Sequence, residues 1–495
     1  MQLTQTDIIS VLRQYNPWWS GGQIPDVPTW KRAAFGELRV WIQKPSAGRA
    51  LLLSGPRQVG KTTLFLQAIN TLVERGIAPT NILYITFDHP LLKLAGIDQL
   101  LKVWRDYEPA KDGPEYLFLD EIQILKDWQV WVKHQVDFNK NRRIAFTGSA
   151  TPLTRDRQES GVGRWSTVRL PTLSFFEYLQ IRHQAPPPGI PALSSLNRLF
   201  DWNAKELSRV ASAAEPLTGI FHEYLLRGGF PQSAKEDSIY AAQKLLREDI
   251  VDKVLKRDMT AMFGVRRVLE LEQVFLYLCM HDGGILDMPT LCSNLGLKRP
   301  TVASFIDLLE STHLIYRLLP LGYGKEILRG RAKIYAADPA IAPSVLLKGK
   351  GLLEDSTALG TAVETAFFKH VFTHLYPQSV AFSYWRDRKG QEVDVIADVG
   401  GRLVPFEVKY REQIKSVDMK GLRSFCEEKK IERAYLITKD MADLRVVPAL
   451  SPGAVTILHL PAALACYWLG QMEQQDPSSQ TSDADRDVER SQADT

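Results

Sequence analysis

The chain has 495 residues, of which 45% are hydrophobic and 24% are charged, and its formal net charge is +4. This length predicts roughly three domains, and the composition is that of an ordinary globular protein with sizeable cores. The net charge is too small to identify a nucleic-acid partner by itself, so any basic surface must be local. The four cysteines form no CxxC pair, which favours free thiols in a reducing compartment over disulfides or zinc sites. The first residues carry no secretory signal, so we expect a cytoplasmic protein without a membrane partner.

Residues 1–50 form a lead-in to the most informative stretch of the chain. In this lead-in, Trp18 and Trp19 could cover a nucleotide base, but we favour them as anchors of the segment. Residues 51–53 predict a buried strand, and residues 63–73 predict a helix. The loop between them matches the P-loop pattern. The predicted nucleotide-contacting residues are Gly55, Pro56, Arg57, Gln58, Val59, Gly60, Lys61, Thr62 and Thr63.

These residue types suit the chemistry of a nucleoside triphosphate. Gly55 and Gly60 let backbone N–H groups close around phosphate oxygens, where larger side chains would clash. The helix that follows adds the positive end of its dipole. Lys61 is a point charge for the β- and γ-phosphates, and the Thr62 hydroxyl is a ligand for Mg²⁺. We therefore expect ATP and Mg²⁺ at this loop.

Three more apolar runs, at residues 81–88, 115–121 and 143–149, are separated by segments of helix length. This alternation is typical of an α/β fold with a parallel sheet. Polar ligands then gather at the carboxyl ends of the strands, where Asp88, Asp120, Glu121 and Thr147 fall. Residues 51–170 are therefore predicted to form a P-loop ATPase core.

Each of these polar residues has a candidate role. Asp120 is predicted to join the Mg²⁺ shell, and Glu121 to polarise the attacking water, a pair that favours hydrolysis over simple binding. Thr147 either hydrogen-bonds the γ-phosphate or water, or caps a turn. Arg164 follows the glycine pair Gly161 and Gly163. It could reach a γ-phosphate in its own subunit or in a neighbouring one, and an ordinary surface arginine is the alternative.

Two units follow the core. Residues 171–260 predict a helical lid packed on the nucleotide module. Residues 265–335 predict three helices, with a tight turn before the third, and then a hairpin, which resembles a winged helix-turn-helix. Its residues that suit contact with DNA are Lys298, Arg299, Thr301, Ser304, Lys325, Arg329, Arg331 and Lys333. Packing against protein is the alternative role of such a unit.

Residues 345–470 predict a further α/β unit. Glu364 lies on a predicted helix, Asp394 on one strand, and Glu407 and Lys409 on the next. Since residues i and i+2 of a strand share a face, Glu407 and Lys409 project together. Asp394 and Glu407 can share a Mg²⁺, and Lys409 can orient or activate water. This is the layout of PD-(D/E)xK nucleases, with a solvated charged strand face as the alternative. We expect residues 471–495 to be a disordered acidic tail.

The motifs together resemble a widespread prokaryotic family. They lie at residues 55–63, 118–123, 146–149 and 174–178, and in the pairs Glu392 with Asp394 and Glu407 with Lys409. The family joins an AAA+-type ATPase to a C-terminal domain of unknown function with a restriction-endonuclease-like fold. The resemblance implies an AAA+ core, a winged helix and a ring or other homo-oligomer. It also implies that Thr147 occupies the sensor position and that Arg164 matches a recurring Gly-Arg.

Three functions stay open at this point. The first is a DNA-acting ATPase that translocates, remodels or branch-migrates DNA, with the nuclease-like domain gripping it. The second is an ATP-gated signalling or defence switch that acts through a protein partner. The third is a metal-dependent DNA nuclease whose ATPase only controls access. We favour the first, because two units suited to DNA follow one ATPase.

Overall fold

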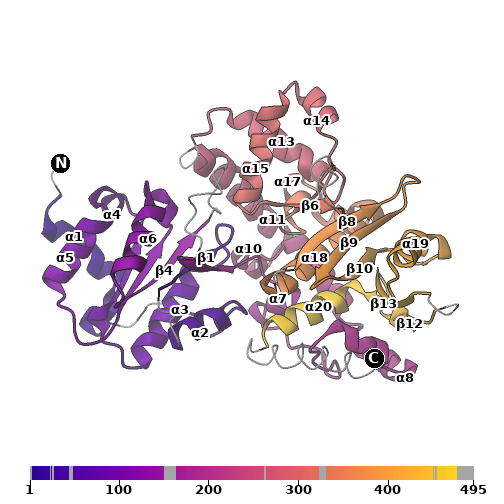
Figure 1. Cartoon of the computed structure of the whole chain (residues 1–495), viewed down its shortest axis with the longest axis horizontal. Coiled ribbons are helices and arrows are strands. Elements are labelled where there is room, and N and C mark those ends of the chain that lie inside the picture. The colour runs from indigo at the N-terminus through magenta and orange to yellow at the C-terminus, as the bar shows by residue number, and fades with distance from the viewer. Residues whose placement is uncertain are drawn as a thin grey trace. The chain divides into compact units, whose positions relative to one another are not determined.

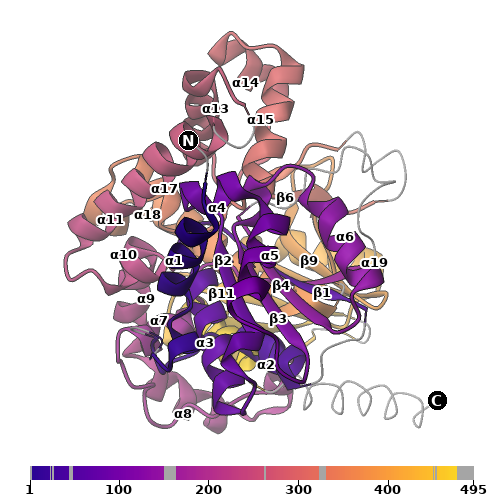
Figure 2. The same ribbon diagram turned by 90° about the vertical axis from the view of Figure 1, so that its left-hand side faces the viewer.

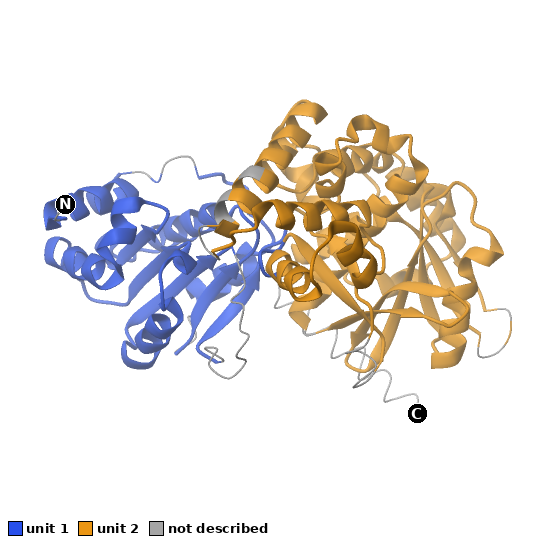
Figure 3. Cartoon of the chain, turned by 90° about the horizontal axis from the view of Figure 1, so that it is seen from above, with its two compact units in different colours: residues 1–171, 311–313, 476–481 blue, residues 172–310, 314–475, 482–495 orange. Residues whose placement is uncertain are grey.

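The computed structural model describes residues 3–22, 24, 27–43, 48–149, 163–260, 264–322, 330–378, 380–449, 451 and 454–475. The chain divides into two compact units, which Figure 3 draws in separate colours. Of the described residues, unit 1 contains those up to Pro171 together with Ser311–His313, and unit 2 contains the others. Among these described segments, no helix combines the length and apolar character that crossing a bilayer requires.

Unit 1 is built on a parallel sheet of five strands in the order β2-β3-β4-β1-β5 (Figures 1 and 2). The strands are β1 (Ala50–Ser54), β2 (Ile82–Thr86), β3 (Glu115–Asp120), β4 (Arg142–Gly148) and β5 (Trp165–Arg169). The first three are runs of almost wholly buried residues, as expected for strands that are covered on both faces. The predicted parallel α/β core is therefore present.

Helices flank this sheet and complete its core. They are α1 (Gln5–Tyr15), α2 (Phe35–Gln43), α3 (Lys61–Glu74), α4 (Pro90–Ala95), α5 (Ile97–Tyr107) and α6 (Trp128–Phe138). One buried apolar cluster includes Leu12 of α1, Trp104 of α5, and Ile85 and Phe146 of the sheet. The lead-in helix is thus part of the nucleotide unit rather than a separate segment.

The lead-in also covers the outer strand β2. The indole N–H groups of Trp18 and Trp19 donate to the Ile82 carbonyl at 3.1 and 2.8 Å. The Asn16 side chain exchanges two hydrogen bonds with the backbone of Tyr84, at 2.9 and 2.7 Å. An outer strand otherwise leaves backbone groups without partners in the sheet. The two tryptophans therefore anchor the segment, as favoured.

Unit 2 begins with helices that were expected to pack on the nucleotide module. Residues 172–310 group with the C-terminal part of the chain, and their packing on the nucleotide module stays a prediction. Helix α7, for example, packs on the last helix, α20. The helices up to residue 260 are α7 (Phe175–Ile181), α8 (Ala204–Ala214), α9 (Leu217–Arg227), α10 (Pro231–Lys235), α11 (Ile239–Arg247) and a π-helix (Glu248–Asp258).

The next stretch contains three helices and a hairpin in the predicted order. They are α13 (Val268–Met280), α14 (Met288–Leu295), α15 (Arg299–Ser311), β6 (Ile315–Pro320) and β7 (Lys333–Ala336). The hairpin is not an isolated wing. Strand β6 pairs with β8, so the hairpin forms the end of an eight-stranded sheet in the order β12-β13-β11-β10-β9-β8-β6-β7.

The rest of that sheet and its helices come from the C-terminal part of the chain (Figure 1). The helices are α17 (Ile341–Val345), α18 (Ser356–Leu375), α19 (Lys420–Lys429) and α20 (Ala462–Glu473). The strands are β8 (Ala381–Arg386), β9 (Glu392–Val399), β10 (Arg402–Val408), β11 (Arg433–Thr438), β12 (Arg445–Val447) and β13 (Thr456–Pro461). Residues 471–473, expected in the tail, are the end of α20, because the apolar face of that helix is buried up to Met472. Residues 476–495 lie outside the described part.

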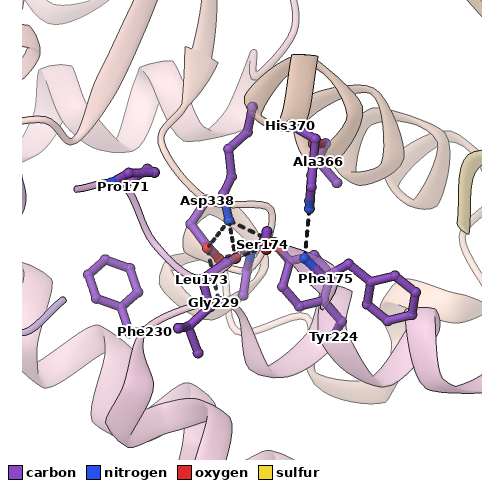
Figure 4. Close-up of polar contacts among 12 residues, drawn as sticks. Pro171, Leu173, Ser174, Phe175, Tyr224, Gly229, Phe230, Asp338, Ala366 and His370 are labelled. Carbon is purple, nitrogen blue, oxygen red and sulfur yellow. Dashed lines mark hydrogen bonds and ion pairs between the residues drawn. The ribbon is translucent and has the colours of Figure 1, made fainter. Parts of the chain in front are cut away.

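A buried polar cluster fixes the start of unit 2 (Figure 4). The Lys369 ammonium, on α18, donates to the Leu173 carbonyl at 2.5 Å and to the Tyr224 hydroxyl at 2.7 Å. It also lies 3.6 Å from Asp338, which accepts a hydrogen bond from the Gly229 N–H at 2.9 Å. Residues from four distant parts of unit 2 therefore share one set of buried charges.

The contact between α20 and α7 can be tested with two helical glycines of unit 2. A Cβ at Gly470 would lie 2.7 Å from Ser174 Oγ and 2.9 Å from Phe176 Cβ, whereas a Cβ at Gly360 meets nothing within 4 Å. We expect Gly470→Ala to destabilise unit 2 by about 1–3 kcal/mol through overpacking. The control, Gly360→Ala, should stabilise it by about 0.5–1 kcal/mol. Urea unfolding midpoints measure both, and equal midpoints would contradict the packing.

Candidate functional site

The P-loop lies between β1 and α3, and its two glycines are required for different structural reasons. At Gly55 a Cβ would fall 2.0 Å from the Leu170 carbonyl oxygen, so only glycine lets the loop pass the end of β5. Gly60 has a φ of +96° directly before α3, and a Cβ there would meet nothing within 4 Å. Gly60 is therefore required by its left-handed backbone, and it leaves open space at the helix start.

Lys61 is the first residue of α3 and its side chain is almost fully buried. Its ammonium donates to the carbonyls of Gly55 and Pro56 at 2.9 and 2.8 Å and lies 3.7 Å from Glu121. Burial lowers the pKa of Lys61, while the acids at Glu121 and Asp120 act in the opposite direction. The lysine is thus held inside the loop, at the end of the sheet that carries the two acids.

Asp120 ends β3, and only 3% of its surface is exposed. Three hydroxyls donate to its carboxylate: Thr62 at 2.6 Å, Tyr84 at 2.8 Å and Thr147 at 2.5 Å. They come from α3 and from the strands on either side of β3. Burial and the neighbouring Glu121 raise the pKa of Asp120, and the three hydrogen bonds oppose this rise.

Glu121 follows directly in a left-handed conformation, with φ of 55°. Its N–H donates to the Thr147 hydroxyl at 2.8 Å, and its carboxylate contacts Gln123 and accepts from Ser149 at 3.1 Å. Burial acts to raise the pKa of Glu121, but Lys61 and the other neighbouring donors outweigh it and hold the pKa below its usual value. The two adjacent acids are thus pushed apart in pKa, as in sites where two carboxyls have different roles.

The other predicted loop residues line the same end of the sheet. Arg57 lies 3.8 Å from Asp88, which follows β2, and Gln58 has a left-handed φ of 62°. The Val59 carbonyl accepts a hydrogen bond from Arg32 at 3.1 Å. Thr63 is the third residue of α3 and is partly buried.

Arg164 lies at the opposite end of the sheet. Its carbonyl accepts from the Ala50 N–H at 2.8 Å, where β1 begins, and its guanidinium pairs with Asp137 of α6 at 2.7 Å. The P-loop follows the other end of β1. Because β1 has five residues, its two ends lie about 15 Å apart. A role for Arg164 at the nucleotide of its own chain is therefore wrong. A role at a neighbouring subunit stays a prediction.

Several residues at this site were missed from the sequence. Tyr84 lies in an apolar strand, where a buried hydroxyl needs a partner, and this signal could have identified it. Arg32 joins the Val59 carbonyl to that of Pro171, at 3.1 and 2.7 Å. His313 lies 3.0 Å from the Ser54 hydroxyl at the end of β1. Burial lowers the pKa of His313 to about 3, which keeps it neutral. The separation of 259 residues between Ser54 and His313 leaves no local sequence signal.

Family comparisons agree with this geometry. A family model described as an AAA domain matches residues 47–179, which contain the P-loop, Asp120, Glu121 and Thr147. Over these residues the chain is similar to an AAA domain. Two further models, Domain of unknown function (DUF8612) and Domain of unknown function (DUF4143), match residues 218–351 and 359–455.

Curated relatives extend over much of the chain. An uncharacterized protein of Haemophilus influenzae is 28% identical over 303 residues, which cover 58% of this chain and 66% of that protein, slightly less than two thirds. An uncharacterized protein of Methanocaldococcus jannaschii is 22% identical over 358 residues, covering 72% of this chain and 74% of that protein. One from Mycobacterium tuberculosis is 25% identical over 367 residues, covering 72% and 70%.

Solved structures with some similarity include the Aeropyrum pernix Orc1 protein in complex with DNA, at 14% identity and a TM-score of 0.30. It aligns with 65% of this chain and 94% of its own. The Thermotoga maritima RuvB Holliday junction branch migration motor follows, at 17% identity and a TM-score of 0.25, covering 60% of this chain and 88% of its own. Scores this low carry no argument about function.

The residues predicted to contact DNA fall into four groups. Lys298, Arg299 and Ser304 are exposed and Thr301 is partly exposed at the start of α15. Arg331 is exposed and pairs with Asp287 at 3.0 Å. Lys325 and Arg329 lie outside the described residues. The prediction for Lys333 is wrong, because only 3% of its side chain is exposed and three carboxylates surround it.

The predicted nuclease set is brought together in unit 2. Asp394 of β9 and Glu407 of β10 lie on paired strands, and the Asp394 N–H donates to Glu407 at 3.2 Å. Lys409 forms an ion pair with Glu407, and Glu364 reaches the set from α18. However, the described residues contain no group of three or more His, Cys, Asp or Glu that could hold a metal ion. The nuclease role stays a prediction without structural support for its metal.

The hydroxyl of Tyr84 offers a specific test of the P-loop site. Tyr84→Phe removes one of the hydrogen bonds that orient Asp120. Because such supporting groups tune metal binding, we expect Mg²⁺-dependent ATP affinity to fall about 10-fold, with little change when Mg²⁺ is omitted. Titration of a fluorescent ATP analogue with and without Mg²⁺ measures this. Tyr116→Phe, four residues before Asp120 on β3, is the control. Equal losses in the two conditions would refute the role.

Proposed function

We propose that the AAA+ core hydrolyses ATP with the help of Mg²⁺. The observation that supports this most is the continuous set of contacts from Thr62 through Asp120 and Thr147 to Glu121. These contacts connect Thr62, at the start of α3, with Glu121, the acid that follows Asp120. A structural role alone does not require a second acid that is only partly exposed and is held ionised beside Lys61.

The residues fit both nucleotide and metal. The loop and the open start of α3 would receive the phosphates, Lys61 would contact the β- and γ-phosphates, and Thr62 with Asp120 would hold Mg²⁺. Bound Mg²⁺ neutralises charge on the phosphate oxygens. Glu121 would polarise the attacking water, and Thr147 would keep Glu121 in place through its backbone N–H. Closure of the site by a neighbouring subunit's Arg164 in a homo-oligomer is part of the proposal.

We further propose that hydrolysis acts on DNA, which unit 2 would contact through the start of α15. Exposed cations at Lys298 and Arg299 precede the exposed hydroxyl of Ser304. A helix start with cations and hydroxyls suits phosphate contact. Translocation, remodelling and branch migration of DNA are the forms that this coupling would take.

The first test is hydrolysis by Glu121→Gln. We expect kcat to fall at least about 100-fold, because the water loses its base, while ATP binding is retained. Lys61→Ala should instead lose binding. The control is Glu74→Gln, an exposed acid on α3. Rates are measured without DNA and with duplex, single strand and a four-way junction. A wild-type rate of ATP hydrolysis in Glu121→Gln would refute the proposal. Hydrolysis rates that none of the DNAs changes would favour a switch with a protein partner.

The DNA contact is tested by reversing charge at α15. Lys298→Glu with Arg299→Glu should weaken DNA binding and reduce the slope of log K against log salt by about 2, since each phosphate contact contributes roughly 0.9. The control reverses two exposed charges elsewhere in unit 2, Lys205→Glu with Arg209→Glu on α8. Fluorescence anisotropy over a salt series gives both slopes. Equal slopes in the two double variants would exclude α15 as the contact.

A further inference from the structure

The side chain of Lys333 fills the centre of the acidic set in unit 2. Its Nζ lies 2.8 Å from Glu364 Oε1, 2.8 Å from Glu392 Oε1 and 2.8 Å from Asp394 Oδ1. An ammonium group has three N–H donors. The three carboxylates therefore accept all three N–H donors of Lys333, whose side chain is only 3% exposed.

Backbone pairing fixes Lys333 at this position. Strand β7 pairs with β6, and Lys333 lies opposite Leu318 in this hairpin. It also forms a bridge with Ile285 on its other side. Since β6 pairs with β8 and β8 with β9, the lysine and the acids of β9 belong to one sheet. Tyr335, two residues further on β7, donates to the same Glu364 oxygen at 2.7 Å.

This arrangement does not fit a divalent metal. Mg²⁺ needs ligand oxygens at about 2.0–2.1 Å, and here the lysine nitrogen holds three oxygens at 2.8 Å. The second oxygen of Asp394 is also engaged, because it accepts from the Val408 N–H at 2.9 Å. Glu407 is occupied by Lys409 and by the Asp394 N–H.

We propose that Lys333 is a built-in cation that takes the place of a divalent metal in this domain. The domain therefore binds no catalytic metal at these acids and does not cleave DNA. The same ion pairs join the hairpin to α18 and β9. This inference is independent of the proposed ATP hydrolysis, because it concerns residues of unit 2 alone.

The direct test compares metal binding by the full-length wild type and Asp394→Asn. Mn²⁺ is titrated without nucleotide, and free Mn²⁺ is followed by electron paramagnetic resonance. Any binding at the P-loop is common to both proteins. We expect the two titrations to coincide and labelled duplex DNA to stay intact with Mg²⁺ or Mn²⁺. A wild-type Mn²⁺ site that Asp394→Asn removes, or DNA cleavage that it removes, would overturn the proposal.

Removing the lysine should create the missing metal site. Lys333→Ala leaves three carboxylates facing one another without their cation, so we expect the melting temperature to fall by roughly 5–10 °C. Mn²⁺ should restore it, and the response should disappear in Lys333→Ala with Asp394→Asn. The control is Lys348→Ala, which removes the more exposed pair with Asp355. A Lys333→Ala protein as stable as wild type and unresponsive to Mn²⁺ would contradict the proposal. If that variant does not fold, the comparison of wild type with Asp394→Asn decides.

Discussion

A charge that is buried without a partner costs several kcal/mol, and this constraint organises both units of the protein. In unit 1 the carboxylate of Asp120 is buried, and three hydroxyls surround it. In unit 2 the ammonium of Lys333 is buried and three carboxylates surround it. The two cases differ in how much charge the partners leave uncompensated. Neutral hydroxyls around Asp120 leave its charge for a cation, whereas the acids around Lys333 are already neutralised in part.

The same constraint explains the path of the chain at the start of unit 2. The buried Lys369 and Asp338 lie 3.6 Å apart in unit 2, and Lys369 donates to the carbonyl of Leu173. Two residues on, the Phe175 N–H donates to the imidazole of His370, the next residue on α18, at 2.7 Å (Figure 4). Polar groups at this depth accept few alternative geometries, because each shift leaves a donor or acceptor without a partner. The path of residues 173–175 in unit 2 is therefore set by directional bonds as well as by apolar packing.

The sequence was most informative where the signal is local. The P-loop, the strand that delivers Asp120 and the pair of strands with Asp394 and Glu407 each depend on spacing within a few residues. Long-range partners left no such signal. His313 reaches Ser54 across 259 residues, and a pattern of apolar residues cannot show this. The packing of α7 on α20 left no local signal either, since an amphipathic face indicates that a helix packs but not against which element.

Lys333 shows why counting charges overestimates a DNA-binding surface. In the sequence it belongs to a basic hairpin, and composition alone favours contact with phosphate. The pairing of β6 with β8 makes that hairpin part of a sheet, and one side of β7 then faces the acids of α18 and β9. Hydrogen bonding between strands decides the direction of each side chain, and the pairing of β6 with β8 joins segments that are distant in the sequence. Of the described cations assigned to DNA, Lys298 and Arg299 at α15 are exposed, and Arg331 is exposed but pairs with Asp287. A DNA partner of unit 2 would therefore meet the helix, while the lysine of β7 meets the protein's own carboxylates.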